Sequence, residues 1–215
     1  MADLIFYTNP MSRGRIARWM LEEVGEPYET VVLDYGTTMK GADYLAVNPM
    51  GKVPAIRHGD AVVTEAAAIC AYLADAFPDK GLAPPHASRE RAPYYRWMFF
   101  AAGPVEAAVT GKSLGLLAPA EKKMMAGYGS FEETIDALEQ AVSQGPYICG
   151  ERFTAADVYV GAQIGWGMMF GSIDKRPAFT DYSGRISARP AAVRAREIDD
   201  ALIAEQKAKE AEPAA

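Results

Sequence analysis

The segment VPAIRHGDAVVTEAAAICAYLADAF, residues 53–77, contains the pattern that decides the fold of the first third of the chain. Two four-residue apolar runs, 53–56 and 61–64, flank His58-Gly59-Asp60, and a Gly-Asp pair in that position favours a hairpin turn. Residues 65–77 then predict a helix. Because proline has no N–H to donate, Pro54 does not fit a central strand position. We therefore expect it among the first residues of a strand, with a special backbone role.

The residues before this segment predict a strand, a helix and a second strand. Residues 3–7 and 28–33 are short apolar runs that favour strands, and residues 13–24 between them have helical periodicity. In that helix the apolar stripe leaves Arg18 on the solvent side, where it can pair with Glu22. A strand–helix–strand order implies a parallel strand pair joined by a crossover. The N-terminal third is therefore predicted to be an α/β domain.

The rest of the chain is predicted to be helical. Residues 78–87 contain three prolines and a glycine, as in a linker, and no strand pattern follows them. We expect helices at about 88–111, 119–144, 154–169, 177–187 and 190–209. The expected organisation is a first domain at 1–79, a linker at 80–87, an all-helical domain at 88–209 and a frayed tail at 210–215. In the predicted helix from 154, Thr154 and Asp157 have the spacing of a capping box, which we interpret as a folding feature.

Composition and charge exclude several classes of function. The 215-residue chain is 50% hydrophobic, has a formal net charge of −6 and contains no apolar run long enough for a membrane span. A negative charge argues against nucleic acid, which needs a basic footprint. Because the N-terminus shows no secretory signal and Cys70 and Cys149 have no CxxC spacing, we expect a cytoplasmic protein with reduced thiols. His58 and His86 have no neighbours at ligand spacing, so we expect no metal site.

Four segments, taken in order, resemble the glutathione transferases. They are residues 6–29 (FYTNPMSRGRIARWMLEEVGEPYE), 48–56 (NPMGKVPAI), 62–77 (VVTEAAAICAYLADAF) and 147–160 (YICGERFTAADVYV). The resemblance implies a thioredoxin-like N-terminal domain of order βαβ-α-ββα, an all-helical C-terminal domain and a homodimer. The Met-Ser-Arg triplet resembles a serine-bearing fungal and bacterial subgroup of that family.

The resemblance also implies a binding site for glutathione as co-substrate. Pro54 occupies the family's cis-proline position, and a cis bond lets the Val53 backbone bind the cysteinyl part of the ligand. Lys52 would face the ligand's glycine carboxylate. Glu65 would help to hold the γ-glutamyl ammonium, and the N–H of Ala66 would bind the γ-glutamyl carboxylate at a helix N-terminus. Ala66 departs from the family's serine, so one hydroxyl contact is missing.

Two hydroxyl groups are candidates for activating the glutathione thiol. The family's serine-type members match Ser12, just before the first helix, and its tyrosine-type members match Tyr7, at the end of the first strand. We favour Ser12, with Tyr7 as the alternative. In a purely structural reading Ser12 is an N-cap and Tyr7 fills the core. Thioredoxin-like oxidoreductases carry a cysteine where this chain has Asn9-Pro10-Met11-Ser12, so a cysteine-based disulfide mechanism is not expected.

The function implied by the resemblance is attack of the activated thiolate on a small hydrophobic electrophile. Methionine and aromatic side chains make adaptable apolar walls. The candidate pocket residues are Met11, Met98, Phe99, Tyr128, Trp166 and Phe170. Two alternatives stay open: a glutathione-dependent peroxidase or disulfide reductase on the same scaffold, and a non-catalytic binding module.

Overall fold

The structure is a computed structural model that describes residues 3–211 of the chain, with side chains up to residue 209. Residues 212–215 of the expected tail lie outside the described part, whereas residues 210 and 211 end a helix. The chain forms two compact units, Met1–Lys80 with Arg189–Ala215, and Gly81–Ala188. The last predicted helix therefore belongs to the first unit, although our expected boundaries place it in the helical domain.

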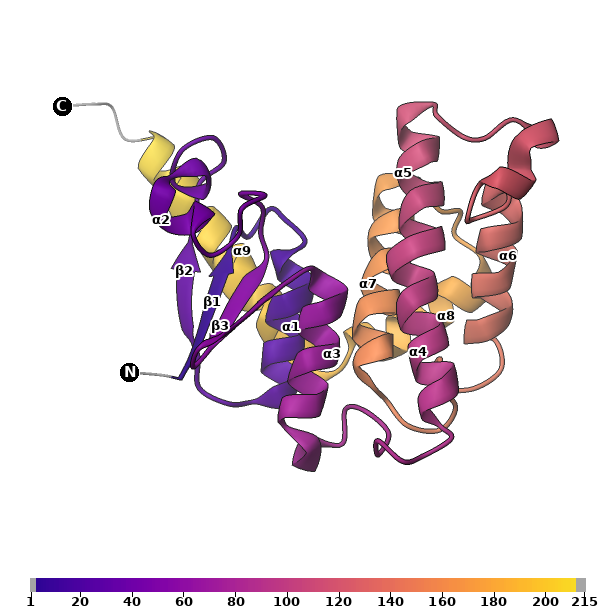
Figure 1. The fold of residues 1–215 in the computed structure, drawn as a ribbon, viewed down its shortest axis with the longest axis horizontal. Helices are drawn as coiled ribbons and strands as arrows, with labels where there is room; N and C mark the ends of the chain where they lie inside the picture. Colours follow the sequence, from indigo (N-terminus) through magenta and orange to yellow (C-terminus); the bar gives the residue numbers. More distant parts are fainter. Residues whose placement is uncertain (1–2, 212–215) are drawn as a thin grey trace. The chain divides into compact units, whose positions relative to one another are not determined.

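The first unit contains a four-stranded mixed sheet in the order β2-β1-β3-β4 (Figure 1). The strands are β1 (Leu4–Thr8), β2 (Glu29–Val32), β3 (Ala55–His58) and β4 (Ala61–Thr64). β1 and β2 are parallel, and both β1–β3 and β3–β4 are antiparallel. The predicted crossover and hairpin are thus confirmed.

Helices cover this sheet. Helix α1 (Gly14–Val24) packs against α3 (Ala66–Ala76), and α9 (Pro190–Ala211) packs against α1. The 3-10 helix η1 (Thr38–Lys40) and α2 (Ala42–Leu45) supply Met39 and Tyr44, which form a cluster with Leu33 and Ala55. Tyr7 packs against that cluster, so this residue of β1 is partly enclosed by α2. The short 3-10 helix η2 (Pro78–Lys80) ends this part of the chain.

Our placement of Arg18 on the solvent side of α1 is wrong. Arg18 is 1% exposed, and its Nε atom donates to Asp199 Oδ1 of α9 at 3.1 Å. The guanidinium also donates to Tyr28 and Thr30 and lies 5.0 Å from the centre of the Phe6 ring. A buried charge requires a partner, and here the partner comes from the C-terminal helix.

The second unit is helical, as predicted. It comprises α4 (Arg91–Phe100), a π-helical turn η3 (Ala101–Val105), α5 (Glu106–Leu114), a 3-10 helix η4 (Ala120–Met125), α6 (Phe131–Val142), α7 (Ala155–Phe170) and α8 (Pro177–Ser187). The prediction of a single helix at 119–144 is wrong, because residues 126–130 between η4 and α6 are not helical. Gly129 there has a φ of 66°, and Ser130 and Glu133 form a capping box that starts α6. The helix expected at 88–111 starts later, at Arg91, and contains the π turn around Pro104.

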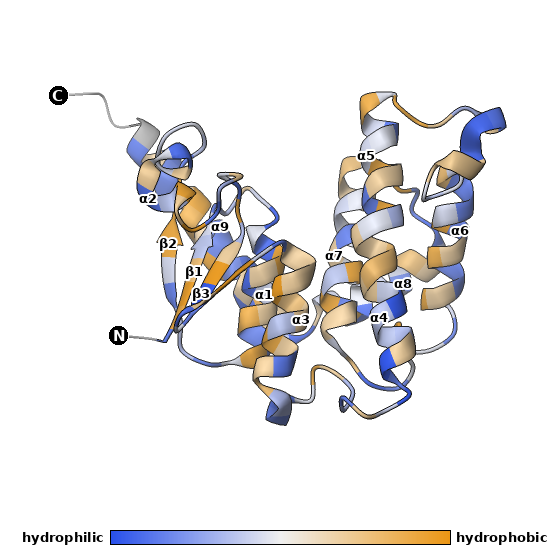
Figure 2. Ribbon diagram, viewed as in Figure 1, coloured by the Kyte–Doolittle hydropathy of each residue, from blue (hydrophilic) through white to orange (hydrophobic). Residues whose placement is uncertain are grey.

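Asp157 of α7 is the polar centre of this unit. Its carboxylate is fully buried and accepts hydrogen bonds from the Thr154 and Ile148 amides and from the Tyr182 hydroxyl, each at 2.8 Å. The predicted capping box is therefore confirmed. Helix α7 is apolar along much of its length (Figure 2), yet no helix of the described residues is long and apolar enough to cross a membrane.

Candidate functional site

Strand register brings three separate loops to one end of the sheet. Tyr7 near the end of β1 pairs with Ala55 at the start of β3, and Ala55 pairs with Thr64 at the end of β4. The turn after β1, the loop before β3 and the start of α3 after β4 therefore lie at the same end. These segments carry Ser12, residues 52–54 and residues 65–66, so all the predicted glutathione-site residues of the first unit lie together at this end.

The turn between β1 and α1 holds Ser12 in a defined position. Its hydroxyl donates to the Asn9 carbonyl at 2.7 Å and accepts the Gly14 N–H at 2.9 Å. Arg13 is the residue preceding α1, and its own side chain makes no capping hydrogen bond. The Ser12 hydroxyl therefore organises the start of α1, and it has one hydrogen, which points at a carbonyl in this arrangement.

Tyr7 is half-buried beside the same end of the sheet. Its ring centre lies 5.6 Å from that of Tyr44, and its hydroxyl makes no hydrogen bond within residues 3–211. The Tyr44 hydroxyl donates to the Lys52 carbonyl at 2.6 Å. Burial raises the pKa of Tyr44 to about 12, so this hydroxyl stays protonated as a donor at neutral pH.

The loop before β3 is fixed by several side chains. The Val53–Pro54 bond is cis, as the resemblance implies. The Asn48 amide donates to the Lys52 carbonyl at 2.7 Å, and the Lys40 ammonium donates to the Gly51 carbonyl at 2.6 Å. The Lys52 side chain itself is exposed and makes no ion pair within the described chain. It is thus available to an anionic ligand.

The start of α3 carries the one positive φ among non-glycine residues of the described chain. Glu65 has φ 68° and ψ 121°, a region that non-glycine residues avoid at a cost of about 1–3 kcal/mol. Glu65 is exposed, Ala66 is 7% exposed, and no side chain caps the helix. The first N–H groups of α3 are therefore left for another acceptor. The sequence pattern did not predict this strain.

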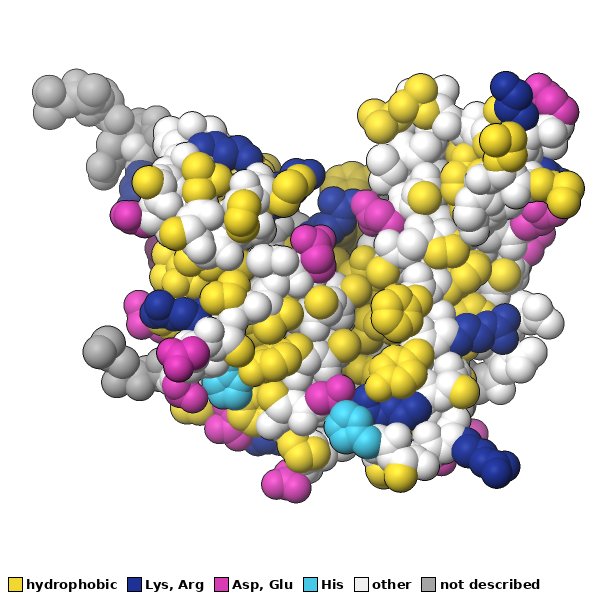
Figure 3. All heavy atoms as spheres, in the orientation of Figure 1, with side chains coloured by type: hydrophobic (Ala, Val, Ile, Leu, Met, Phe, Trp, Pro, Cys, Tyr) yellow, Lys and Arg dark blue, Asp and Glu magenta, His cyan; other side chains and the backbone are white. Residues whose placement is uncertain are grey.

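The predicted pocket residues are divided between the two units. Met11 lies in the first unit and is 70% exposed. In the second unit, Phe99 is 70% and Phe170 is 76% exposed, Trp166 is half-buried, and hydrophobic side chains reach the surface along α4 (Figure 3). Met98 is 3% exposed and packs inside the helical unit, and the Tyr128 hydroxyl accepts the Ala118 N–H at 2.8 Å. Met98 and Tyr128 therefore serve packing and loop structure in this unit.

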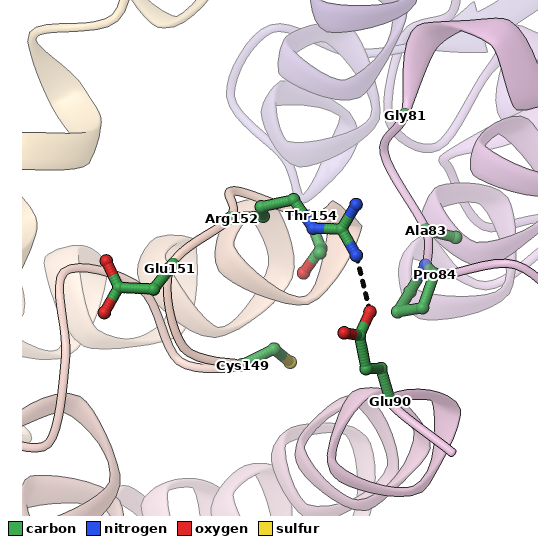
Figure 4. A pocket seen from close by; sticks show the side chains of 8 residues that line it. All are labelled: Gly81, Ala83, Pro84, Glu90, Cys149, Glu151, Arg152 and Thr154. Atoms are coloured by element: carbon green, nitrogen blue, oxygen red, sulfur yellow. Dashed lines mark hydrogen bonds and ion pairs between the residues drawn. The ribbon is translucent and has the colours of Figure 1, made fainter. Parts of the chain in front are cut away.

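A separate cavity of about 180 Å³ lies in the second unit (Figure 4). It is lined by Gly81, Ala83, Pro84, Glu90, Cys149, Glu151, Arg152 and Thr154, and an Arg152–Glu90 ion pair crosses it. Burial and the Asp157 carboxylate raise the pKa of the Cys149 thiol to about 12, and burial raises the pKa of Cys70 strongly. Both thiols are therefore protonated and poorly nucleophilic at neutral pH. No predicted site residue lines this cavity.

The structure adds residues that sequence reasoning missed. Hydrogen bonds from the Asn9 side chain shape the turn after β1. The loop before β3 is held through hydrogen bonds to its backbone carbonyls from Lys40, Tyr44 and Asn48. No group of three or more His, Cys, Asp or Glu residues suited to a metal ion occurs in residues 3–211.

Comparison with known proteins agrees with the fold. The model of the glutathione S-transferase N-terminal domain matches residues 11–76, and that of the C-terminal domain matches residues 60–166. The chain is 30% identical to glutathione S-transferase GstA of Escherichia coli O157:H7 in an alignment over 191 residues that covers 86% of this chain and 90% of GstA. The chain belongs to the glutathione S-transferase family. The predicted family and its thioredoxin-like and helical domains are therefore confirmed.

Two solved glutathione transferase structures are similar to this chain over more than nine-tenths of its length. A glutathione transferase of Methylococcus capsulatus is 32% identical, with a TM-score of 0.76 over 92% of this chain and 98% of that one. A sphingomonad glutathione S-transferase complexed with glutathione is 31% identical, with a TM-score of 0.74 over 91% of this chain and 98% of that one.

Proposed function

We propose that this glutathione S-transferase family member binds glutathione at the end of its sheet and activates the thiol for attack on a hydrophobic electrophile. The observation that carries the proposal is the register that gathers Ser12, residues 52–54 and residues 65–66 at one end of the sheet. The sphingomonad relative, solved with glutathione bound, supports the same ligand here.

Each group has a distinct task in this proposal. The Val53 backbone pairs with the extended cysteinyl unit in the manner of an added strand. The exposed Lys52 ammonium attracts the glycine carboxylate. The uncapped N–H groups at Ala66 bind the γ-glutamyl carboxylate, and Glu65 attracts the ammonium. The strained backbone of Glu65 is a further sign of a functional position.

We assign thiol activation to Ser12, with Tyr7 as the alternative. For this the Ser12 hydroxyl exchanges its bond to the Asn9 carbonyl for one to the thiolate. A neutral hydrogen bond contributes about 0.5–1.5 kcal/mol and a bond to a charged group about 1.5–3 kcal/mol, so the exchange is favourable. The Gly14 N–H, which donates to the same oxygen, polarises the hydroxyl and makes it a better donor.

The reaction that follows is a substitution. The thiol proton passes to solvent, the thiolate sulfur forms a bond to the electrophilic carbon, and the bond from that carbon to its leaving group breaks. We propose Met11, Phe99, Trp166 and Phe170, all wholly or partly exposed, as apolar groups available to the electrophile. The homodimer and the cytoplasmic location are proposed from the family likeness.

Calorimetry with glutathione, combined with turnover of an aryl halide, tests the proposal. We expect saturable binding below the millimolar range and thioether formation that requires glutathione. Cysteinylglycine, which lacks the γ-glutamyl group, serves as the control ligand and should bind more weakly. Absence of any binding heat up to millimolar glutathione would overturn the proposal. Binding without turnover of any electrophile would indicate a binding module, and faster turnover of a hydroperoxide than of the aryl halide would indicate a peroxidase.

A further inference from the structure

The chain contains two asparagines, and both occur in the tripeptide Asn-Pro-Met, at residues 9–11 and 48–50. The two turns have matching hydrogen bonds. The Asn9 Oδ1 atom accepts the Met11 N–H at 2.9 Å, and the Asn48 Oδ1 atom accepts the Met50 N–H at 3.1 Å. The backbone carbonyl of each asparagine also accepts the N–H three residues later, at 3.0 Å for Ser12 and 2.8 Å for Gly51.

Both asparagines are buried within these turns. Asn9 is 5% exposed and Asn48 is 4% exposed, whereas Met11 and Met50 are 70% and 65% exposed. The side-chain amide of Asn9 donates to the Leu33 carbonyl at 2.8 Å, which ties its turn to the chain after β2. The amide of Asn48 donates to the Lys52 carbonyl at 2.7 Å, within its own loop. Each amide thus uses its oxygen to shape a turn and its nitrogen to anchor it.

The two turns hold different parts of the site. The Asn9 side chain shapes the turn that ends at Ser12, whose N–H donates to the Asn9 carbonyl at 3.0 Å, so Asn9 positions the residue to which the proposed function assigns thiol activation. Asn48 holds the Lys52 carbonyl together with Tyr44, and that carbonyl belongs to the peptide that leads into Val53. Within residues 3–211, the hydrogen bonds of Asn48 do not reach Ser12, and those of Asn9 do not reach residues 48–53.

We propose that Asn9 and Asn48 are positioning residues with separate tasks. Asn9 sets the hydroxyl that activates the thiol, and Asn48 sets the backbone and the lysine that bind the ligand. This inference rests on the proposed function. It goes beyond that function by dividing activation and binding between two turns of the same construction.

The test compares Asn9→Ala and Asn48→Ala, each of which is the matched control for the other. We expect Asn9→Ala to lower kcat about tenfold and to shift the acid limb of the pH–rate profile upward by about one unit, with the glutathione Kd within about twofold of the parent. We expect Asn48→Ala to raise the glutathione Kd about tenfold, with the pH–rate profile unmoved. A merely structural role would change both quantities alike in both variants, and that result, or no change in either variant, would overturn the proposal.

A second measurement does not depend on glutathione. Amide hydrogen exchange should become about tenfold faster at Met11 in Asn9→Ala and at Met50 in Asn48→Ala, each without change at the other turn. If exchange becomes faster only at the mutated turn but the parent does not bind glutathione, the proposed function is refuted, while the structural independence of the two turns is supported. Exchange that rises at both turns in either variant would refute their independence. If an alanine variant fails to fold, the neutral variant Asn9→Ser or Asn48→Ser, which keeps a side-chain oxygen as acceptor for the turn and loses the amide donor, is measured instead, with the same division between pH–rate profile and Kd expected.

Discussion

Replacing Asp199 by alanine should destabilise the protein severely, because it leaves a buried charge without its partner. Asp199 and Arg18 are each 1% exposed, and the Arg18 Nε atom donates to the Asp199 carboxylate at 3.1 Å. The hydroxyls of Tyr28 and Thr30 would remain as acceptors for the guanidinium, but neither carries a negative charge. Removing one partner of a buried ion pair costs about 3–5 kcal/mol, and we expect a loss of that size in the free energy of unfolding.

The next residue of the same helix provides the control. Asp200 also binds an arginine of α1, since Arg15 Nη2 lies 2.7 Å from its carboxylate, but the Asp200 side chain is 58% exposed. Exposed ion pairs contribute about 0–1 kcal/mol, so Asp200→Ala should cost no more than that. Urea unfolding followed by circular dichroism gives both values.

A double variant separates the missing charge from the missing contacts. Arg18→Met together with Asp199→Leu removes both charges and fills the space with apolar atoms, and it should recover most of the loss. Equal costs for Asp199→Ala and Asp200→Ala would refute the reasoning, because burial would then make no difference. A double variant no more stable than Asp199→Ala would show that packing or hydrogen bonds, and not the unpaired charge, caused the loss.

Three further predictions concern the site and its support. Ser12→Ala should raise the pKa of bound glutathione by about one to two units, measured by thiolate absorbance, while Tyr7→Phe should raise it clearly less; the reverse order would assign activation to Tyr7. Ala66→Ser should tighten glutathione binding up to about tenfold in calorimetry, because the start of α3 lacks a side-chain cap, and weaker binding would contradict this use of the helix N-terminus. Burial raises the pKa of Asp199, so the folded state holds this proton more tightly than the unfolded state does. The stabilisation linked to the proton is full below the unfolded pKa of about 4 and is lost as the pH rises through the folded value, whereas the ion pair with Arg18 that Asp199→Ala removes remains. The parent's stability relative to Asp199→Asn should therefore fall with rising pH in urea unfolding, and a relative stability that rises with pH would reverse the sign.

The elements of the first unit could be predicted because their signals are local. Apolar runs, a Gly-Asp turn and one helical stripe lie within residues 3–77, and each is decided by near neighbours in sequence. The unexpected interruption between η4 and α6 was visible in part in the sequence, since Gly127 and Gly129 lie within the predicted helix 119–144. The apolar residues on either side favour a helix, but two glycines within three residues disfavour one.

The error at Arg18 concerns a contact between residues far apart in the chain. Arg18 was assigned to solvent because its nearest acidic neighbour on the helix is Glu22, whereas its partner lies 181 residues later. Helical periodicity reports which face of a helix is apolar, but it cannot show that a buried arginine finds its carboxylate on another helix. The two Asn-Pro-Met turns are different, because the repeated tripeptide is visible in the sequence and only its hydrogen bonds needed the structure.

The position of α9 also determines which parts of the chain can be studied separately. A fragment ending at Lys80 would keep Ser12, Lys52, Val53, Pro54, Glu65 and Ala66. It would lose Asp199 and with it the counter-charge of Arg18, together with Arg189, whose guanidinium binds both carboxylate oxygens of Glu23 at 2.7 Å. An uncompensated buried arginine costs about as much as a third of the stability of an average domain. Failure of such a fragment to bind glutathione would therefore report the missing helix and not a missing ligand contact, so binding must be measured on the full chain.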